Sequence, residues 1–462
     1  MRNVYAALQA HAADHPDHPA VVTETGTHSY GALAARVNRL GRWVAELPQT
    51  IGIVGGKGVE TIAMDLALSQ AGRTLVPLPD FFSPEQLAHI RADAGIEAVV
   101  AEPGKQGFAG FPGCPIQVPV EAEAEPISPA GSGRRIIYTS GTTGKPKGVV
   151  LGSGQLEASI AALALAVGAT RQDRMLSVLP YALLLEQVAG IGVPLTIGAS
   201  IALCPRMQDL PRAAHALAPT ATVLVPDMLA AWVEWLEQSG SPVPPALRFI
   251  AVGGAPVPPR LAERAWKLGL PVHEGYGLSE CCSVVAVNRP GERRAGTVGH
   301  PLPGVTVTID QGEIVVAGPT VMDRYLGGEA TGGIRRTGDA GYFDAEGRLV
   351  VEGRRDDIIV TSAGRNIHPD WIESMLLADR RIQRCAVVDG GSHPRAVVVP
   401  APGAPWTEEV DQVVANLCAE APDYARPRNS LVMFEADLAR NGLITSNGRL
   451  RRTAIHAYLR KM

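Results

Sequence analysis

Short apolar strands alternate with amphipathic helices through the first hundred residues, and this alternation constrains the fold more than any other feature. Residues 29–47 place their apolar side chains on one helical stripe, with Ser29 as the expected N-cap. Residues 51–55 then have the pattern of an apolar strand, 59–72 that of a helix and 74–79 that of another strand. Strand–helix–strand alternation predicts a mostly parallel sheet covered by helices.

The pattern changes after about Pro301, where short strands separated by turns indicate antiparallel pairing up to Gly353. A smaller unit of mixed strands and helices follows, of a length typical of a domain. We therefore predict an α/β fold. A large N-terminal domain of helix-covered sheets, residues 1–353, is joined by a hinge to a smaller α+β C-terminal domain, residues 354–462.

Composition limits the partners that the chain can have. Lys plus Arg is 42 and Asp plus Glu is 46, so the net charge is −4 and we expect no binding to nucleic acid. Gly and Pro interrupt the most apolar stretches, so no transmembrane segment is expected. The 6 cysteines show no metal-binding spacing, and the N-terminal residues lack the apolar core of a signal peptide. We expect free thiols and a cytoplasmic location.

A loop rich in glycine, hydroxyl groups and lysine follows an apolar strand in the stretch IIYTSGTTGKPKGVVLG, residues 136–152. Backbone N–H groups, hydroxyls and ammonium groups are the donors that a phosphate needs at close range. The stretch is not a Walker A loop, because only two residues separate Gly141 from Gly144 and Pro146 follows Lys145. We predict a phosphate-binding loop followed by a returning strand. A surface hairpin is the structural alternative.

The string YTSGTTGKPKGVV resembles the phosphate-binding signature of the adenylate-forming (AMP-binding) superfamily, which includes acyl-CoA and aryl-CoA synthetases. Six further stretches resemble motifs of that family in the same order along the chain. They are VPDML (225–229, strand–helix junction before the adenine site), VGGAPVP (252–258, adenine), EGYGLSE (274–280, nucleotide and magnesium), RTGDAGYFDAEGRL (336–349, ribose), GRRDDIIVTSAGRNIHP (353–369, hinge and the segment after it) and NGLITSNGRLRR (441–452, catalytic loop).

The resemblance implies roles for individual residues. ATP or AMP would be bound by Thr139, Ser140, Gly141, Thr142, Thr143, Gly144, Gly254, Ala255, Pro256, Gly275, Tyr276, Gly277, Ser279, Asp339 and Arg354. Lys147, Glu280 and Arg449 would be the catalytic residues, with Glu280 as a ligand of Mg²⁺. Asp356 would be the hinge.

Each of these side chains has suitable chemistry and also a structural alternative. Tyr276 offers an aromatic face to adenine, or is a residue of the core. Asp339 can accept hydrogen bonds from both ribose hydroxyls, or forms a turn before Gly341. Glu280 can hold Mg²⁺ together with phosphate oxygens, or is a solvated surface residue.

The expected substrate is an apolar carboxylic acid. Residues 179–199 resemble the pocket-lining segment of long-chain acyl-CoA synthetases, with Leu183 where those sequences often carry a histidine. We expect Leu183, Leu184 and Cys281 to line the pocket, although core packing would also explain the leucines. No Asp is placed to hold an α-amino group, as amino-acid-activating domains have, so a fatty acyl or aryl acid is favoured.

The resemblance implies that ATP and Mg²⁺ activate this acid as an acyl-adenylate. The acyl group would then pass to the thiol of coenzyme A or of a phosphopantetheinyl carrier protein, so the expected partners are a small-molecule carboxylic acid and a separate acyl carrier protein. Two alternatives stay open: a non-thiol acceptor such as an amine, and a catalytically degenerate nucleotide-binding protein. The second arises because Arg449 stands where relatives carry a lysine. We expect Arg449 to replace that lysine, because it also supplies a permanent cation.

Overall fold

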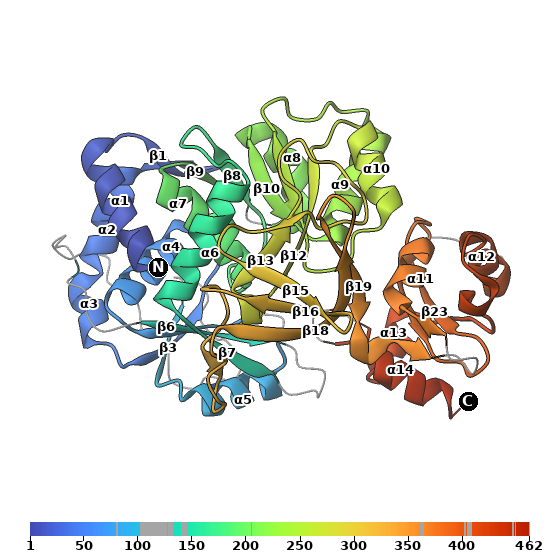
Figure 1. The fold of residues 1–462 in the computed structure, drawn as a ribbon. Helices are drawn as coiled ribbons and strands as arrows, with labels where there is room; N and C mark the ends of the chain where they lie inside the picture. Colours follow the sequence, from blue (N-terminus) through green and yellow to red (C-terminus); the bar gives the residue numbers. More distant parts are fainter. Residues whose placement is uncertain are drawn as a thin grey trace.

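The computed structural model describes residues 1–79, 82–101, 127, 133–139, 146–204, 206–360, 365–401, 403, 409–445, 448 and 450–461. Two helix-covered sheets and one antiparallel sheet form a large N-terminal body (Figure 1). A smaller unit, orange and red in Figure 1, packs at the other end of the molecule beside the strand β19 (Leu349–Arg354). This two-part α/β arrangement confirms the predicted fold class.

The larger sheet has 9 strands in the order β14-β13-β12-β11-β10-β8-β9-β1-β2. The bounds are β1 Pro19–Thr23, β2 Gly26–Ser29, β8 Arg174–Ser177, β9 Ser200–Leu203, β10 Ala221–Leu224, β11 Phe249–Val252, β12 Val272–Leu278, β13 Ser283–Val287 and β14 His300–Pro301. The six strands from β12 to β1 run parallel, and antiparallel strands close both edges. The predicted parallel sheet is therefore present.

The second sheet has 6 strands in the order β17-β7-β6-β4-β3-β5. The bounds are β3 Thr50–Val54, β4 Thr74–Pro77, β5 Ala98–Ala101, β6 Arg134–Thr139, β7 Lys147–Gly152 and β17 Arg324–Tyr325. The strand β7 pairs antiparallel with β6 from Thr139 and Lys147 onward, so the predicted returning strand is confirmed. The residues between Thr139 and Pro146 lie outside the described part of the chain.

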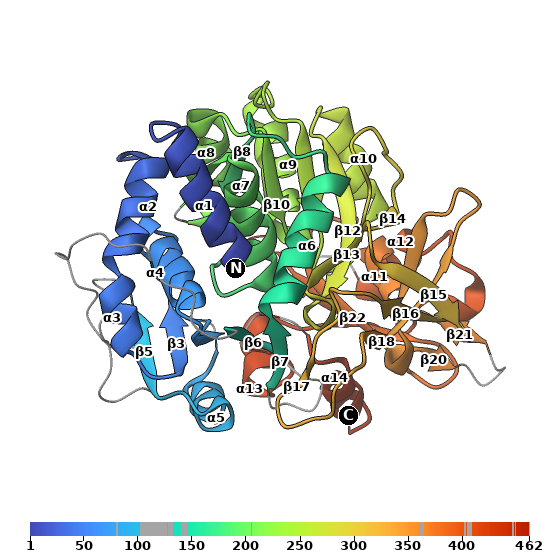
Figure 2. The ribbon, with the colours of Figure 1, turned by 60° about the vertical axis from the view of Figure 1, so that its left-hand side comes forward.

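Helices cover these sheets. The bounds are α1 Arg2–Asp14, α2 Tyr30–Arg39, α3 Gly41–Glu46, α4 Val59–Gln70, α5 Pro84–Ala94, α6 Ser153–Ala166, the π-helix η1 Glu186–Gly192, α7 Val193–Ile197, α8 Leu210–Leu217, α9 Pro226–Ser239 and α10 Pro259–Lys267. The helices α1, α2 and α4 pack together, and α6 lies between this group and β13 (Figure 2). Most of their apolar side chains enter one continuous core with the nine-stranded sheet.

The helix predicted over 29–47 is two helices. Ser29 caps α2 as expected, accepting a hydrogen bond from the backbone N–H of Ala32. However, α2 ends at Arg39 and α3 begins at Gly41. Glycine is a poor residue for the interior of a helix, because it loses the most backbone entropy there. The apolar stripe is nevertheless kept, since Leu33 and Val37 of α2 and Val44 of α3 are all buried.

An antiparallel sheet of 4 strands follows the main body, in the order β15-β16-β18-β19. The bounds are β15 Thr306–Asp310, β16 Glu313–Ala317 and β18 Ile334–Phe343. The short helix η4 (Arg355–Asp357) then leads into the C-terminal unit. That unit contains β20 Ile359–Val360, β21 Asn366–Ile367, α11 Pro369–Leu376, β22 Ile382–Val388, β23 Arg395–Pro400, α12 Val410–Leu417, β24 Leu431–Val432, α13 Glu435–Arg440 and α14 Arg452–Leu459. The predicted antiparallel strands and α+β unit are both present.

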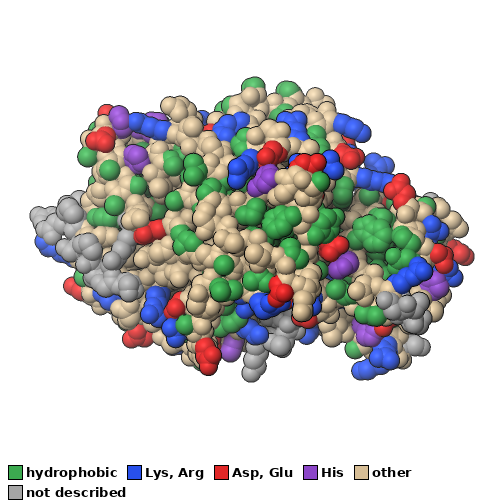
Figure 3. Space-filling model, in the orientation of Figure 1, with side chains coloured by type: hydrophobic (Ala, Val, Ile, Leu, Met, Phe, Trp, Pro, Cys, Tyr) green, Lys and Arg blue, Asp and Glu red, His purple; other side chains and the backbone are tan. Residues whose placement is uncertain are grey.

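The surface carries mixed charge, and the described cysteines are free thiols, as the composition predicts. Figure 3 shows Lys and Arg side chains interspersed with Asp and Glu over the face drawn. Cysteines 204, 281, 282, 385 and 418 are buried free thiols. Within the described ranges, no helix combines the length and the apolar character needed to cross a membrane.

A buried ion pair joins three elements of the N-terminal body. Arg135, on β6, donates hydrogen bonds to Asp65 on α4 and to Gln187 on η1. Both charged side chains are at most 2% exposed. A buried charge needs a partner, because taking it out of water without one is very costly. The pair therefore specifies how β6, α4 and η1 meet.

We predict that Asp65→Ala destabilises the protein by about 3–5 kcal/mol, because it leaves the Arg135 guanidinium buried without its counter-charge. Urea denaturation measures the free energy of unfolding. Glu237→Ala is the matched control, since it breaks an ion pair with Arg264 whose side chains are 38% and 40% exposed and should cost about 0–1 kcal/mol. A loss of less than 1 kcal/mol in Asp65→Ala would contradict this role.

Candidate active site

One cavity of about 680 Å³ connects the nine-stranded sheet with the antiparallel sheet and the short helix η4. At one end it is lined by polar side chains from β7, β12, β17, β18 and β19. At the other end it is lined by apolar side chains from the nine-stranded sheet, α6, η1, α7 and the segment before η1. The cavity is therefore divided into a polar half and an apolar half.

Most of the residues predicted from the sequence motifs meet in this cavity. Its lining includes Thr139, Lys147, Leu183, Leu184, Gly254, Gly275, Tyr276, Gly277, Ser279, Glu280, Asp339, Arg354 and Asp356. Ala255 and Pro256 lie on an exposed turn directly after Gly254 and do not line it. Residues 140–144 and Arg449 lie outside the described residues, so their predicted roles stay predictions.

Cys281 is placed differently from the expectation. It is 0% exposed and is packed in the core rather than in the described lining of the cavity. Ser283, two residues further on, lines the cavity instead. The reason is the backbone, because Cys282 and Ser283 both have positive φ, at 54° and 87°, and the chain reverses there.

Asp339 is held at the polar half by two donors. Asp339 and Arg354 are opposite each other in the β18–β19 ladder, and Arg354 donates to one carboxylate oxygen at 3.0 Å. The Tyr276 hydroxyl donates to the other oxygen. Burial raises the pKa of Asp339, and these two donors act against that rise. A carboxylate has about four acceptor sites, so the two that remain suit a ribose diol.

Gly338 has to be a glycine for Arg354 to reach Asp339. Its φ is +75°, and an added Cβ would lie 2.8 Å from a guanidinium nitrogen of Arg354. A side chain would therefore meet both backbone strain and a steric clash. The TGD sequence of the ribose motif thus has a local physical reason in this chain.

A second polar cluster surrounds Tyr325, which the sequence analysis missed. The strand β17 pairs with β7, with Tyr325 opposite Val149, and this brings the phenol close to Lys147. Its hydroxyl donates to Glu280 at 2.6 Å and accepts from Arg335 at 3.0 Å. The Lys147 ammonium and the Arg335 guanidinium lie 5.8 and 5.3 Å from the centre of the ring.

This arrangement of two cations and one carboxylate suits a triphosphate with a divalent cation. Lys147 and Arg335 can balance phosphate charge, and Glu280 supplies the oxygen ligand that Mg²⁺ prefers. The Nε of Arg335 is buried with no hydrogen-bond partner among the described residues, so the guanidinium has a donor left for a further acceptor. Nothing local in the sequence marks Tyr325 or Arg335, except that Arg335 directly precedes the RTGD stretch.

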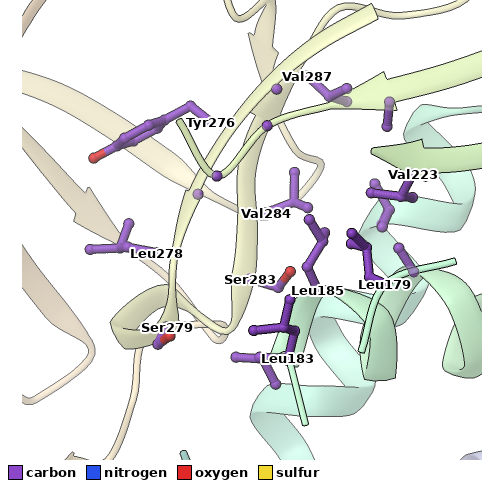
Figure 4. Close-up of a pocket in the computed structure, with 18 of the residues that line it drawn as sticks. Leu179, Leu183, Leu185, Val223, Tyr276, Leu278, Ser279, Ser283, Val284 and Val287 are labelled. Atoms are coloured by element: carbon purple, nitrogen blue, oxygen red, sulfur yellow. The ribbon is translucent and has the colours of Figure 1, made fainter. Parts of the chain in front are cut away.

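The apolar half runs along the face of the nine-stranded sheet. The apolar half is lined by Ala221 and Val223 of β10 and by Val225, which follows this strand. This alternation is expected because successive side chains of a strand point to opposite faces of the sheet. Leu179, Leu183 and Leu185 cover the apolar half from the other side (Figure 4). Four strand steps from Ala221 to Val225 span roughly 13 Å, so this half is deep enough for an extended acyl chain or an aromatic ring system.

An ion pair closes the far end of the apolar half. Arg248 donates to both carboxylate oxygens of Asp173, at 2.8 and 2.6 Å. It also donates to the backbone carbonyls of Val167 and Gly168, each at 3.2 Å, at the end of α6. The charge of Arg248 is therefore neutralised within the protein.

The comparisons with known proteins agree with this site. Residues 8–326 match the family model described as "AMP-binding enzyme". The 2-succinylbenzoate–CoA ligase of Bacillus cereus (strain AH820) is 31% identical over 429 residues, covering 85% of this chain and 86% of that one. The enzyme of the same name from Bacillus subtilis (strain 168) is 33% identical over 290 residues, or 58% of each chain.

Solved structures show the same architecture. The O-succinylbenzoate coenzyme A synthetase of Bacillus subtilis in complex with AMP superposes with a TM-score of 0.83 at 26% identity, covering 97% of both chains. Its complex with ATP and magnesium ion gives a TM-score of 0.80 at the same identity, over 97% of this chain and 98% of that one.

Fold and site together define an adenylate-forming enzyme. The chain belongs to the AMP-binding enzyme family, and it is an AMP-forming acid–thiol ligase. It activates a carboxylic acid with ATP as an acyl-adenylate and then transfers the acyl group to a thiol.

We predict that Asp339→Ala weakens ATP binding by about 1–3 kcal/mol, because two hydrogen bonds to the ribose are lost and each contributes about 0.5–1.5 kcal/mol. Isothermal titration calorimetry with ATP measures this. Asp310→Ala is the control, because Asp310 is an exposed partner of Arg336 outside the cavity lining. Equal ATP affinity in the Asp339→Ala variant and the wild type would contradict the assignment.

We predict that Glu280→Gln lowers the rate of adenylation and raises the Mg²⁺ concentration needed for half-maximal rate, by about tenfold or more, because a neutral amide replaces a charged ligand. Pyrophosphate release over a Mg²⁺ titration measures both effects. Glu329→Gln, at an exposed position outside the cavity, should match the wild type. An unchanged Mg²⁺ dependence in Glu280→Gln would show that Glu280 is not the ligand.

Proposed function

We propose that this enzyme is an acid–CoA ligase for a monocarboxylic acid with an apolar tail, fatty acyl or aryl. The observation that carries the proposal is the single cavity in which a polar half around Asp339 and Lys147 continues into a deep apolar half. Such a cavity suits a substrate whose carboxylate lies at the nucleotide and whose tail lies between the leucines and the sheet.

The apolar half differs from what a second carboxylate would require. The relatives are named for 2-succinylbenzoate, which carries two carboxylates. Among the described residues that line the apolar half, Arg248 is the one cation, and Asp173 already neutralises it. A second carboxylate placed there would be desolvated without a counter-charge, which is strongly unfavourable. This favours an acid with a neutral tail.

The adenylation step needs positioning more than proton transfer. A carboxylate oxygen attacks the α-phosphorus of ATP, the new P–O bond forms, and the bond to the β-phosphate oxygen breaks to release pyrophosphate. The carboxylate is already an anion, so no general base is required. Asp339 and Tyr276 would hold the nucleoside, while Lys147 and Arg335 would balance phosphate charge. Bound at Glu280, Mg²⁺ would supply further positive charge at the phosphates.

The thiol acceptor that we propose is coenzyme A, and the names of the relatives support it. The same chemistry would serve a phosphopantetheinyl carrier protein, because both acceptors present the same kind of thiol. Thioester formation requires the thiol to reach the acyl-adenylate. We infer that the C-terminal unit that follows η4 moves about Asp356 between the two steps, because Asp356 lies in this short helix and lines the cavity, whereas Arg354 before it is still paired in the β18–β19 ladder.

We predict that wild-type enzyme releases pyrophosphate faster with octanoate, decanoate, benzoate or 3-phenylpropanoate than with 2-succinylbenzoate, by about tenfold or more in kcat/KM, because the second carboxylate has no partner. Product formation with and without coenzyme A identifies the acceptor. The proposal is wrong if 2-succinylbenzoate is the best substrate, or if no acid supports pyrophosphate release.

We also predict that Ala251→Phe shortens the acids that are accepted, because Ala251 lines the cavity on β11 and a phenyl group would fill the space midway along it. For the longest accepted acid, kcat/KM should fall by about tenfold or more, with the shortest acid little changed. Ala231→Phe, on the exposed face of α9, is the control. A uniform loss for all chain lengths would contradict this position for the tail.

A further inference from the structure

Ser283 is a polar side chain in the apolar half whose hydroxyl has no partner. The residue is 7% exposed, lines the cavity, and its Oγ makes no hydrogen bond within the described part of the structure. Asp173 and Arg248, the other polar side chains described there, bind each other. Figure 4 shows the Ser283 hydroxyl beside Leu183 and Leu185. A buried hydroxyl without a partner is unusual and calls for an explanation.

The backbone holds Ser283 in this position against its own preference. Its φ of 87° follows a φ of 54° at Cys282, and side chains other than glycine rarely adopt such values. Two hydrogen bonds hold the backbone of Cys282. Its carbonyl accepts from the Ser159 hydroxyl at 2.6 Å, and the Cys282 N–H donates to the Ser279 carbonyl at 3.1 Å. Strained residues that are held by several contacts cluster at ligand-binding sites.

Gly277 allows the backbone of Ser283 to pack closely against β12. Ser283 is paired with Leu278 in the β12–β13 ladder, and a Cβ on Gly277 would collide with the Ser283 carbonyl oxygen. Leu278 and Ser279 also line the cavity, next to the nucleotide end. Ser283 therefore lies in the part of the apolar half that adjoins the polar half, and we infer that the carboxyl end of the acid lies close to it.

We propose that Ser283 is a specificity-determining residue that forms a hydrogen bond with a neutral polar group of the acid, close to its carboxylate. Such a group is a hydroxyl or carbonyl substituent on one of the first carbons of an acyl chain, or a hydroxyl, carbonyl or aromatic amino substituent at the ortho position of an aryl acid. This inference rests on the proposed function, and it narrows the substrate to an acid with an apolar tail and a polar substituent near the carboxylate.

The chemistry of the surroundings favours a neutral group. A serine hydroxyl can donate one hydrogen bond and accept up to two, so it can pair with a hydroxyl, a carbonyl or an aromatic amino group. Leu183, Leu185 and Val284 surround it, and they provide no counter-charge for an ionised substituent (Figure 4). A site that contains a buried hydroxyl discriminates against an analogue that leaves this hydroxyl unpaired.

Matched pairs of acids test the proposal: benzoate with 2-hydroxybenzoate, and octanoate with 3-hydroxyoctanoate. The readout is the ratio of kcat/KM within each pair, from pyrophosphate release by the full-length protein. Wild type should prefer the hydroxylated member of at least one pair by about tenfold or more. Ser283→Ala should bring that ratio to within about threefold of unity, mainly by slowing the hydroxylated acid.

Ser283→Gly is the second variant, because glycine also removes the hydroxyl but adopts positive φ without strain. It keeps the test open if Ser283→Ala does not fold. Val284→Ala is the control, since it changes an apolar neighbour in the same lining and should keep the wild-type ratio.

Two results would overturn the inference while leaving the proposed function intact. One is a wild type that turns over these acids without preferring either hydroxylated member. The other is an equal loss for both members of each pair in the Ser283 variants, which would mean that Ser283 acts on the reacting carboxylate. Failure of wild type to turn over any acid would instead contradict the proposed function, and the inference with it.

Discussion

The buried ion pair between Arg135 and Asp65 is the interaction on which the geometry of the site depends. Arg135 lies on β6, the strand that leads into the glycine-rich loop, and it also binds Gln187 on η1, the π-helix beside the apolar half of the cavity. Gln187 in turn donates to the backbone carbonyl of Tyr181 at 3.0 Å. A charge in the core tolerates few arrangements, because each unpaired alternative is costly. The strand before the glycine-rich loop and the helix beside the apolar half are thus linked through one buried charge.

The polar half of the cavity depends on strand pairing rather than on any single segment. Asp339 meets Arg354 because β18 and β19 are in register, and Tyr325 approaches Lys147 because the two-residue strand β17 pairs with β7. Glu280 joins this cluster through the Tyr325 hydroxyl. Each of the three sheets of the N-terminal body therefore contributes to one polar cluster, the proposed nucleotide site, and a shift in the register of one strand would separate its groups.

The border between the polar and apolar halves is where the backbone departs most from ordinary conformations. Positive φ at Cys282 and Ser283 costs about 1–3 kcal/mol per residue, and the surrounding hydrogen bonds and the absence of a side chain at Gly277 hold the turn in place. The same turn directs Glu280 to the polar cluster and Ser283 to the apolar half. Strain here is consistent with a segment shaped by the substrate rather than by folding alone.

The sequence by itself determined the features that depend on local spacing. Alternating strand and helix periods indicated the parallel sheets, and the order of six motifs indicated the family, because a phosphate-binding loop or a ribose-binding Asp needs its neighbours at definite positions along the chain. Tyr276, Asp339 and Arg354 were predicted in this way to bind the nucleotide, and they meet in the cavity.

Only the tertiary structure decided which distant residues meet. Tyr325 reaches Glu280 because β17 pairs with β7, and Arg335 on β18 donates to the same Tyr325 hydroxyl. Arg135 meets Gln187 across 52 positions of sequence. Ser283 lines the cavity in place of the predicted Cys281 because Cys282 and Ser283 both have positive φ, which the residue pattern does not predict. Likewise, the helix expected over 29–47 breaks at Gly41 while keeping its apolar stripe. The physical reason is common to all of these: periodicity reports local backbone conformation, whereas contacts between distant residues depend on strand register and core packing, which the whole chain decides together.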